Sequence, residues 1–177
     1  PVNINVVTSA RTAELQFTAS SVASSVTLEI SGTDGVEVLT FTSGTTASAM
    51  AFAVNRISDA TGVQAALKNS ATLASGLVFQ STGYGSRNFV SVHAQSGNFT
   101  TQDPNGALTG RSVGRDAVAT VNGALTVGDG LSIKLNTTTL DMNLTLDKNF
   151  GAGTTSFAIT GGGSLFQLGP QVTSNQQ

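Results

Sequence analysis

Hydrophobic side chains recur at every second position in short stretches of this chain, and polar turn residues separate the stretches. Residues 26–31 alternate in this way, and after the turn Gly32-Thr33-Asp34-Gly35 the stretch 36–41 begins apolar again. A period of two puts the apolar side chains on one face of a strand. Because an Asp-Gly pair accepts the positive φ of tight turns, the pattern predicts a β-hairpin.

One segment has a helical period instead. Its apolar stripe has the spacing i, i+3, i+4, i+7 and consists of Met50, Ala53, Val54 and Ile57. Such a stripe forms one face of an amphipathic helix. Thr45 or Thr46 can cap its amino end, and Gly62 can adopt the left-handed conformation that ends a helix. The sequence therefore predicts one helix, at about residues 47–59, packed on a sheet.

The rest of the chain has the residue choice of strands and turns, rich in Val, Thr, Ile and Phe between Gly, Asn, Asp and Ser. Further strands are expected at residues 2–7, 13–17, 63–67, 77–80, 89–93, 117–121, 131–135, 142–146 and 155–159, the first two being either separate strands or one bent strand. The expected fold class is α+β, mostly β, with antiparallel hairpins and one packed helix.

The expected domain division is a β-rich domain with the helix at residues 1–100 and a smaller all-β domain at 111–163. Residues 97–110 lack periodicity and form the boundary or an excursion. The stretch 164–177 follows a triple glycine and has neither a strand nor a helix pattern.

Composition removes several functional classes. The chain has no Cys, one His, 10% charged residues and a net charge of −2. Disulfides, thiolate zinc sites, cysteine nucleophiles and sites with several histidines are excluded. The eight basic residues are scattered singly, which favours neither nucleic acid nor a membrane as partner, and no apolar run has the roughly 20 residues of a membrane span. We expect no cofactor and no metal.

The candidate catalytic residues are few. Ser91, His93 and Asp103 supply the residue types of a hydrolase triad, but no Gly-x-Ser-x-Gly turn presents a nucleophile. We therefore expect no enzyme activity.

Two kinds of binding residue remain to be considered. The acidic residues, none with the spacing of a calcium loop, are Asp34, Glu37, Asp129, Asp141 and Asp147. Turn formation accounts for Asp34 and Asp129, each of which precedes a glycine. Tyr84, the one Tyr of a chain without Trp, is the only candidate platform for a sugar ring, the alternative being a packing contact at a sheet edge.

Several blocks resemble flagellins and the flagellar filament cap. Residues 28–35, 39–46 and 53–63 are similar to a repeated hairpin-helix motif of these proteins, and residues 116–123 with 130–135 are similar to their short Ile-Asn-Gly motif. Val54 and Val121 replace the usual Ile. Residues 81–92 and 161–170 resemble flagellin rather than the cap, the second at the point where such chains return to a helical core.

The resemblance implies a structural protein: the outer, solvent-exposed region of a flagellin subunit in the bacterial flagellar filament, extracellular and serving motility. It implies other flagellin subunits as partners, joined through terminal helices that lie outside this chain, with 164–177 as the segment that re-enters the helical core. The filament cap is the nearer relative if the protein is not flagellin. An adhesin or glycan-binding module, with glycans or host surfaces as partners, is the alternative. An inserted outer region further predicts that residues 2–7 and 165–168 approach each other at one end of the molecule.

Overall fold

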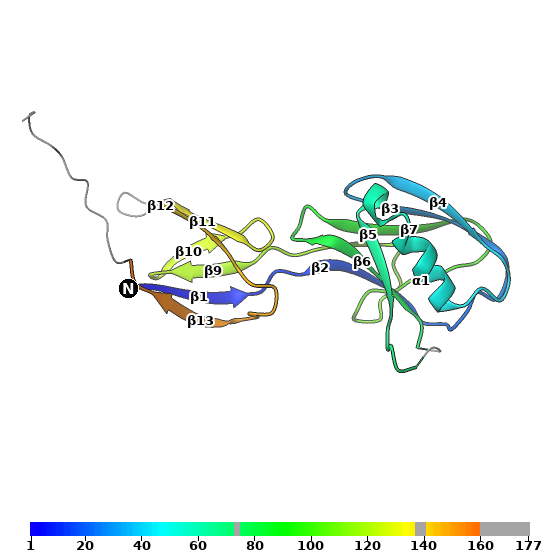
Figure 1. Cartoon of the computed structure of the whole chain (residues 1–177), viewed down its shortest axis with the longest axis horizontal. Helices are drawn as coiled ribbons and strands as arrows, with labels where there is room; N and C mark the ends of the chain where they lie inside the picture. Colours follow the sequence, from blue (N-terminus) through cyan, green and yellow to red (C-terminus); the bar gives the residue numbers. More distant parts are fainter. Residues whose placement is uncertain (73–74, 137–140, 160–177) are drawn as a thin grey trace, which may run out of the picture.

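The computed structural model describes residues 1–72, 75–136 and 141–159, and it shows two units arranged end to end (Figure 1). Antiparallel sheets make up most of both units, and the helices belong to the first. The mostly β, α+β fold class expected from the sequence is confirmed.

The first unit is built from two sheets and the helical segment, which share one hydrophobic core. One sheet has the order β2-β6-β5, and the other has the order β4-β3-β7-β8. The strands are β2 (Thr12–Phe17), β3 (Val26–Gly32), β4 (Val36–Phe41), β5 (Val63–Leu67), β6 (Leu77–Tyr84), β7 (Phe89–Ser96) and β8 (Arg111–Val113). The helix α1 (Ala47–Asn55) packs mainly against β5, and its Met50 and Val54 are completely buried.

The single helix expected at about 47–59 is in fact two helices. After α1, a second short helix, α2 (Ser58–Thr61), follows. Asn55 explains the break, because its side-chain amide donates to the carbonyl of Ala65 at 2.8 Å and accepts from the Ala65 N–H at 2.7 Å. The hydroxyl of Ser58 donates to the carbonyl of Asn55 at 2.9 Å. Asn55 thus fastens the end of α1 to β5. The amino-end cap is as expected, since the side chain of Thr46 accepts from the N–H of Ala49.

Gly62 ends α2 in the left-handed conformation, with φ at 72° and its N–H donating to the carbonyl of Ser58 at 2.7 Å. We expect Gly62→Val to lower the free energy of unfolding by roughly 1 kcal/mol or more, since a β-branched residue is strained at positive φ. Gly62→Asn should cost less, because Asn tolerates this region better. Urea unfolding of the three proteins measures both effects. Equal stabilities for Val and Asn would remove the strain argument.

The predicted hairpin forms, with β3 and β4 paired from Val26–Phe41 to Ser31–Val36. Its turn differs from the expected one, because neither Asp34 nor Gly35 has a positive φ. Gly35 is required for another reason: a Cβ at this position would lie 2.5 Å from the carbonyl oxygen of Ala60. The hairpin end therefore lies directly against α2.

The second unit contains a four-stranded sheet of order β10-β9-β1-β13 and a two-stranded sheet of β11 and β12. Its strands are β1 (Val2–Thr8), β9 (Val118–Val121), β10 (Ala124–Val127), β11 (Ser132–Asn136), β12 (Asp141–Thr145) and β13 (Gly153–Phe157). Side chains from both sheets bury a separate core, which includes Ile4, Val6, Val121 and Ile133.

Strand β1 lies in the second unit although it begins the chain. Its Ile4 lies between Val121 of β9 and Thr155 of β13. This pairing differs from the expected division, which grouped residues 1–100. The segment 97–110 also belongs to the first unit: Phe99 stacks on Phe17 with 4.3 Å between ring centroids, and Gln16 and Gln102 exchange backbone hydrogen bonds.

The two ends of the described chain lie side by side at one end of the molecule (Figure 1). Val2 pairs with Phe157. From this end β1 runs toward the first unit, and β13 runs antiparallel to it, back from the first unit. The expected approach of residues 165–168 and the re-entry segment 164–177 fall outside the described residues.

Candidate functional site at the junction of the two units

The chain crosses between the units twice, and the two crossing segments pair with each other (Figure 1). The N–H of Arg11 donates to the carbonyl of Arg115 at 2.8 Å, and the N–H of Arg115 donates to the carbonyl of Arg11 at 2.9 Å. The N–H of Gly85 also donates to the carbonyl of Arg11, at 3.1 Å. Because backbone hydrogen bonds continue through the crossing, the two units are connected by more than a flexible linker.

A carboxylate from the second unit fastens the loop that follows β6. Asp116 accepts hydrogen bonds from the N–H of Ser86 at 2.9 Å, from the Ser86 hydroxyl, and from the N–H of Gly130 at 2.8 Å. Hydrogen bonds to an ionised acceptor are the stronger kind. A nearby ion pair, Arg87 with Asp129 at 3.2 Å, is exposed on both sides and contributes little. We call the contact of Ser86 and Gly130 with Asp116 the junction clip.

The clip requires a residue without a side chain at position 85. A Cβ on Gly85 would lie 2.5 Å from Oδ1 of Asp116 and 2.6 Å from Cα of Gly130. The backbone φ of Gly85 is 101°. Only glycine combines this close approach with a positive φ. The sequence Tyr84-Gly85-Ser86 therefore presses the first unit directly onto the backbone of the second.

The environment of Asp116 sets its protonation. Partial burial favours the neutral form, but the hydrogen bonds from the Ser86 side chain, the Gly130 backbone and the Ser86 backbone, with the charge of Arg87, outweigh it and lower the pKa of Asp116 below its usual value. A carboxyl with a lowered folded-state pKa adds stability above its unfolded-state pKa and loses it as the pH falls through the folded-state pKa.

We therefore expect the junction clip to persist at neutral and mildly acidic pH and to open only below the ordinary range of an aspartate. Asp116→Asn should weaken it already at neutral pH, because the amide has one accepting oxygen where the carboxylate has two, and it carries no charge. NMR signals of Ser86 and Gly130 followed from pH 7 to pH 2 measure this directly. Asp59→Asn, on α2 far from these contacts, is the control. Signals that titrate alike in the Asp116 variant and the original protein would contradict the assignment.

The structure does not assemble the candidate triad. Ser91 and His93 lie on the exposed side of β7, where His93 stands opposite Glu29 of β3. The carboxylate of Asp103 accepts from the N–H groups of Asn105 and Ala107, both at 2.9 Å, and shapes its own loop.

The acidic candidates do not gather either. Within residues 1–72, 75–136 and 141–159, no three His, Cys, Asp or Glu side chains are placed to hold a metal ion. Asp147 caps a turn by accepting from the N–H of Asn149 at 2.7 Å. Asp129 pairs with Arg87 as described above.

Tyr84 is half-buried and packs against the core of the second unit. Tyr84 therefore forms a contact between the units. The sequence had left a sugar platform and a sheet-edge contact as the two alternatives. Asp116, Ser86 and Gly85 were missed as a site because residues of these types beside glycine have the pattern of ordinary turns. Of the helices in the described part, none has the length and apolarity to cross a membrane.

Comparison with known protein families finds a match to one part of this chain. Residues 27–83 match the family model of the flagellin hook IN motif, which covers β3, β4, both helices, β5 and nearly all of β6. The resemblance of the hairpin-helix block to flagellar proteins is thereby confirmed. The comparison with curated proteins gives no match.

Solved structures match both units together. The D2-D3 domains of the flagellar cap protein FliD from Escherichia coli are 18% identical, with 88% of each chain covered and a TM-score of 0.57. FliD (HAP2) from Pseudomonas aeruginosa PAO1 is 22% identical over 84% of this chain and 80% of that chain, with a TM-score of 0.51. The cap protein FliD from Bdellovibrio bacteriovorus is 11% identical over 82% and 92%, with a TM-score of 0.54. The fold is therefore that of flagellar cap domains, and the chain carries a flagellin motif within it.

Proposed function

We propose that this chain is the outer, solvent-exposed region of a flagellin subunit in the bacterial flagellar filament, and that it is extracellular. The observation that carries the proposal is the pairing of Val2 with Phe157, in a chain whose residues 27–83 match a flagellin motif. An outer region inserted into a longer chain must leave a core and return to it at one place. Strands β1 and β13 provide adjacent outgoing and returning segments.

The junction supports a mechanical role in this proposal. A filament subunit repeats many times, so a loosely hinged outer region would give the filament a poorly defined surface. The junction clip and the paired crossing segments hold the second unit, which carries both ends of the described chain, against the first. In the proposed assembly, the second unit faces the filament core and the first unit projects from it.

The filament cap is a second candidate, and a specific observation favours it. The matched cap domains from E. coli correspond to both units of this chain, with 88% of each chain covered. Flagellin remains the first proposal because residues 81–92 and 161–170 resemble flagellin blocks.

Immunogold electron microscopy of flagella from the source bacterium separates the candidates. Antibodies raised against residues 12–113 should label the filament along its whole length if the chain belongs to flagellin. Labelling confined to the filament tip would identify the cap and overturn the flagellin proposal. Labelling at the base of the filament, or of other surface structures, would contradict both candidates. The same filaments treated with serum taken before immunisation are the control.

A further inference from the structure

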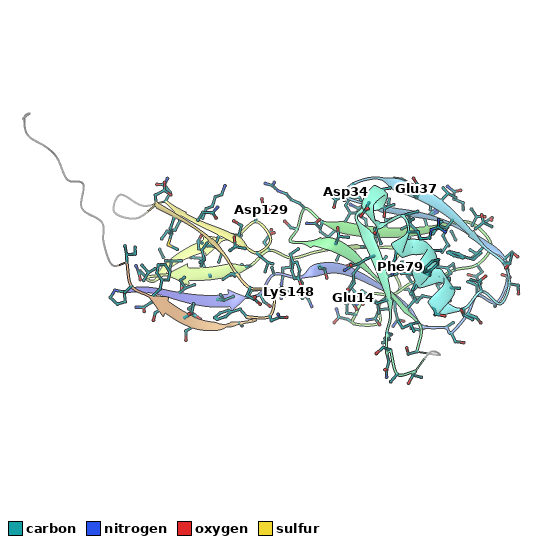
Figure 2. The ribbon with its side chains drawn as sticks, in the orientation of Figure 1. Glu14, Asp34, Glu37, Phe79, Asp129 and Lys148 are labelled. Atoms are coloured by element: carbon teal, nitrogen blue, oxygen red, sulfur yellow. The ribbon has the colours of Figure 1, made fainter. Side chains whose placement is uncertain are left out.

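A cleft of about 290 Å³ lies beside the junction clip and is bordered by both units and by the crossing segments. Thr12 and Glu14 of β2 line it from the first unit, and Lys148, in the loop after β12, lines it from the second. Arg11 and Arg115 line it from the two crossing segments. Figure 2 shows Glu14 and Lys148 on either side of the junction.

Basic residues that lie singly along the sequence come together in the lining of the cleft. Arg11, Arg115 and Lys148 are three of the eight basic residues of a chain with a net charge of −2. Across the part of the chain that the structure describes, the one ion pair joins Arg87 and Asp129, so none of these three cations has a carboxylate within ion-pair distance. The pairing of the crossing segments brings together two arginines that lie far apart in the sequence.

The only acidic side chain of the cleft is already engaged. Oε1 of Glu14 accepts from the side-chain amide of Gln16 at 2.7 Å, and its Oε2 accepts from that of Gln80 at 3.4 Å. Both partners lie on the sheet of the first unit, in β2 and β6. The carboxylate of Glu14 is thus held by neutral amides, and the cleft keeps an excess of positive charge.

One of the cations is held in place by the junction itself. The guanidinium of Arg115 donates to the carbonyl of Ser9 from Nε at 3.3 Å and from Nη2 at 3.2 Å. Its backbone is fixed by the paired crossing segments. A cation that is ordered before a ligand arrives loses less conformational freedom on binding.

We propose that this cleft binds an oxyanion, the carboxylate or phosphate group of a small ligand. Guanidinium groups present fixed donors that match carboxylate and phosphate oxygens, and an ammonium group adds a point charge. The volume lies just below the range of drug-sized ligand pockets, which starts at about 300 Å³, and suits a free anion or one acidic sugar ring. The inference is independent of whether the chain belongs to flagellin or to the cap.

NMR titration of the whole ¹⁵N-labelled chain at constant ionic strength tests the proposal. The probes are inorganic phosphate, glucuronate and, as the neutral counterpart, glucose. Phosphate or glucuronate should saturably shift the backbone signals of Arg11, Thr12 and Arg115, with a dissociation constant in the millimolar range, and glucose should not. The variant Arg11→Gln/Lys148→Gln should weaken binding by about tenfold or more, since two of three charge-assisted contacts are lost.

The control variant is Arg56→Gln/Lys68→Gln, which removes the same charge from exposed positions of the first unit outside the cleft. It should bind as the original protein does. Tighter binding of glucuronate would identify an acidic sugar as the source of the oxyanion, and equal or tighter binding of phosphate would identify a free inorganic anion. The proposal is overturned if neither anion gives saturable shifts, or if both double variants bind alike.

Discussion

Val54→Asp is expected to unfold the first unit. Val54 is completely buried near the carboxyl end of α1, within the core shared by the helix and both sheets. An unpaired carboxylate buried there costs several kcal/mol, a large part of the roughly 5–15 kcal/mol that stabilises an ordinary domain. Circular dichroism and the dispersion of NMR signals from residues 12–113 should show the loss.

Phe52→Asp is the matched control for this change. Phe52 lies two residues away on the same helix, and 68% of it is exposed. The same carboxylate at this position meets water, so the melting temperature should remain within a few degrees of the original value. Equal melting temperatures for the two variants would contradict the orientation of α1.

Gly85→Ala is expected to disrupt the junction while both cores stay folded. The new Cβ would meet Asp116 and the backbone of Gly130 at 2.5 to 2.7 Å, contacts that real Cβ atoms do not make. Because a backbone segment cannot yield as a side chain can, the loop of Ser86 must move away from Asp116. We expect small-angle X-ray scattering and residual dipolar couplings to show a changed or more variable angle between the units.

Gly44→Ala separates strain from contact in this experiment. Gly44 also has a positive φ, 82°, but a Cβ there would meet nothing within 4 Å. It carries the cost of left-handed backbone, roughly 1–2 kcal/mol, without the collision. Dipolar couplings that agree for the Gly85 variant and the original protein would show that the clip does not set the angle.

Local patterns predicted local structure well in this chain. The stripe with Met50 and Val54 located α1 because a period of 3.6 residues is visible within two turns, and the caps Thr46 and Gly62 marked its beginning and the end of α2. The break after Asn55 was not visible in that pattern. It depends on a hydrogen-bonded pair with Ala65 on a strand that had yet to be placed.

Long-range pairing could not be predicted in the same way. The alternation in residues 2–7 indicates a strand but says nothing about its partners, which begin more than a hundred residues later. Strand β10 was missed because its apolar residues Leu125 and Val127 face outward, with 69% and 64% exposed, so its pattern has no buried counterpart. The junction depends on two such distant approaches, and for this reason no single stretch of sequence reveals it.

The nesting of one unit within the other has a consequence for the order of folding. Ile4 and Val121 are paired although they lie 117 positions apart in the sequence. Once the first unit has formed and brought Arg11 beside Arg115, the loop still to be closed shrinks to about a dozen residues, which lowers the entropic cost of pairing β1 with β9 by about 2 kcal/mol. A chain that emerges amino end first exposes β1 long before β9 and β13 exist. The first unit should therefore fold first and bring together the two halves of the second unit, β1 on one side and β9 to β13 on the other.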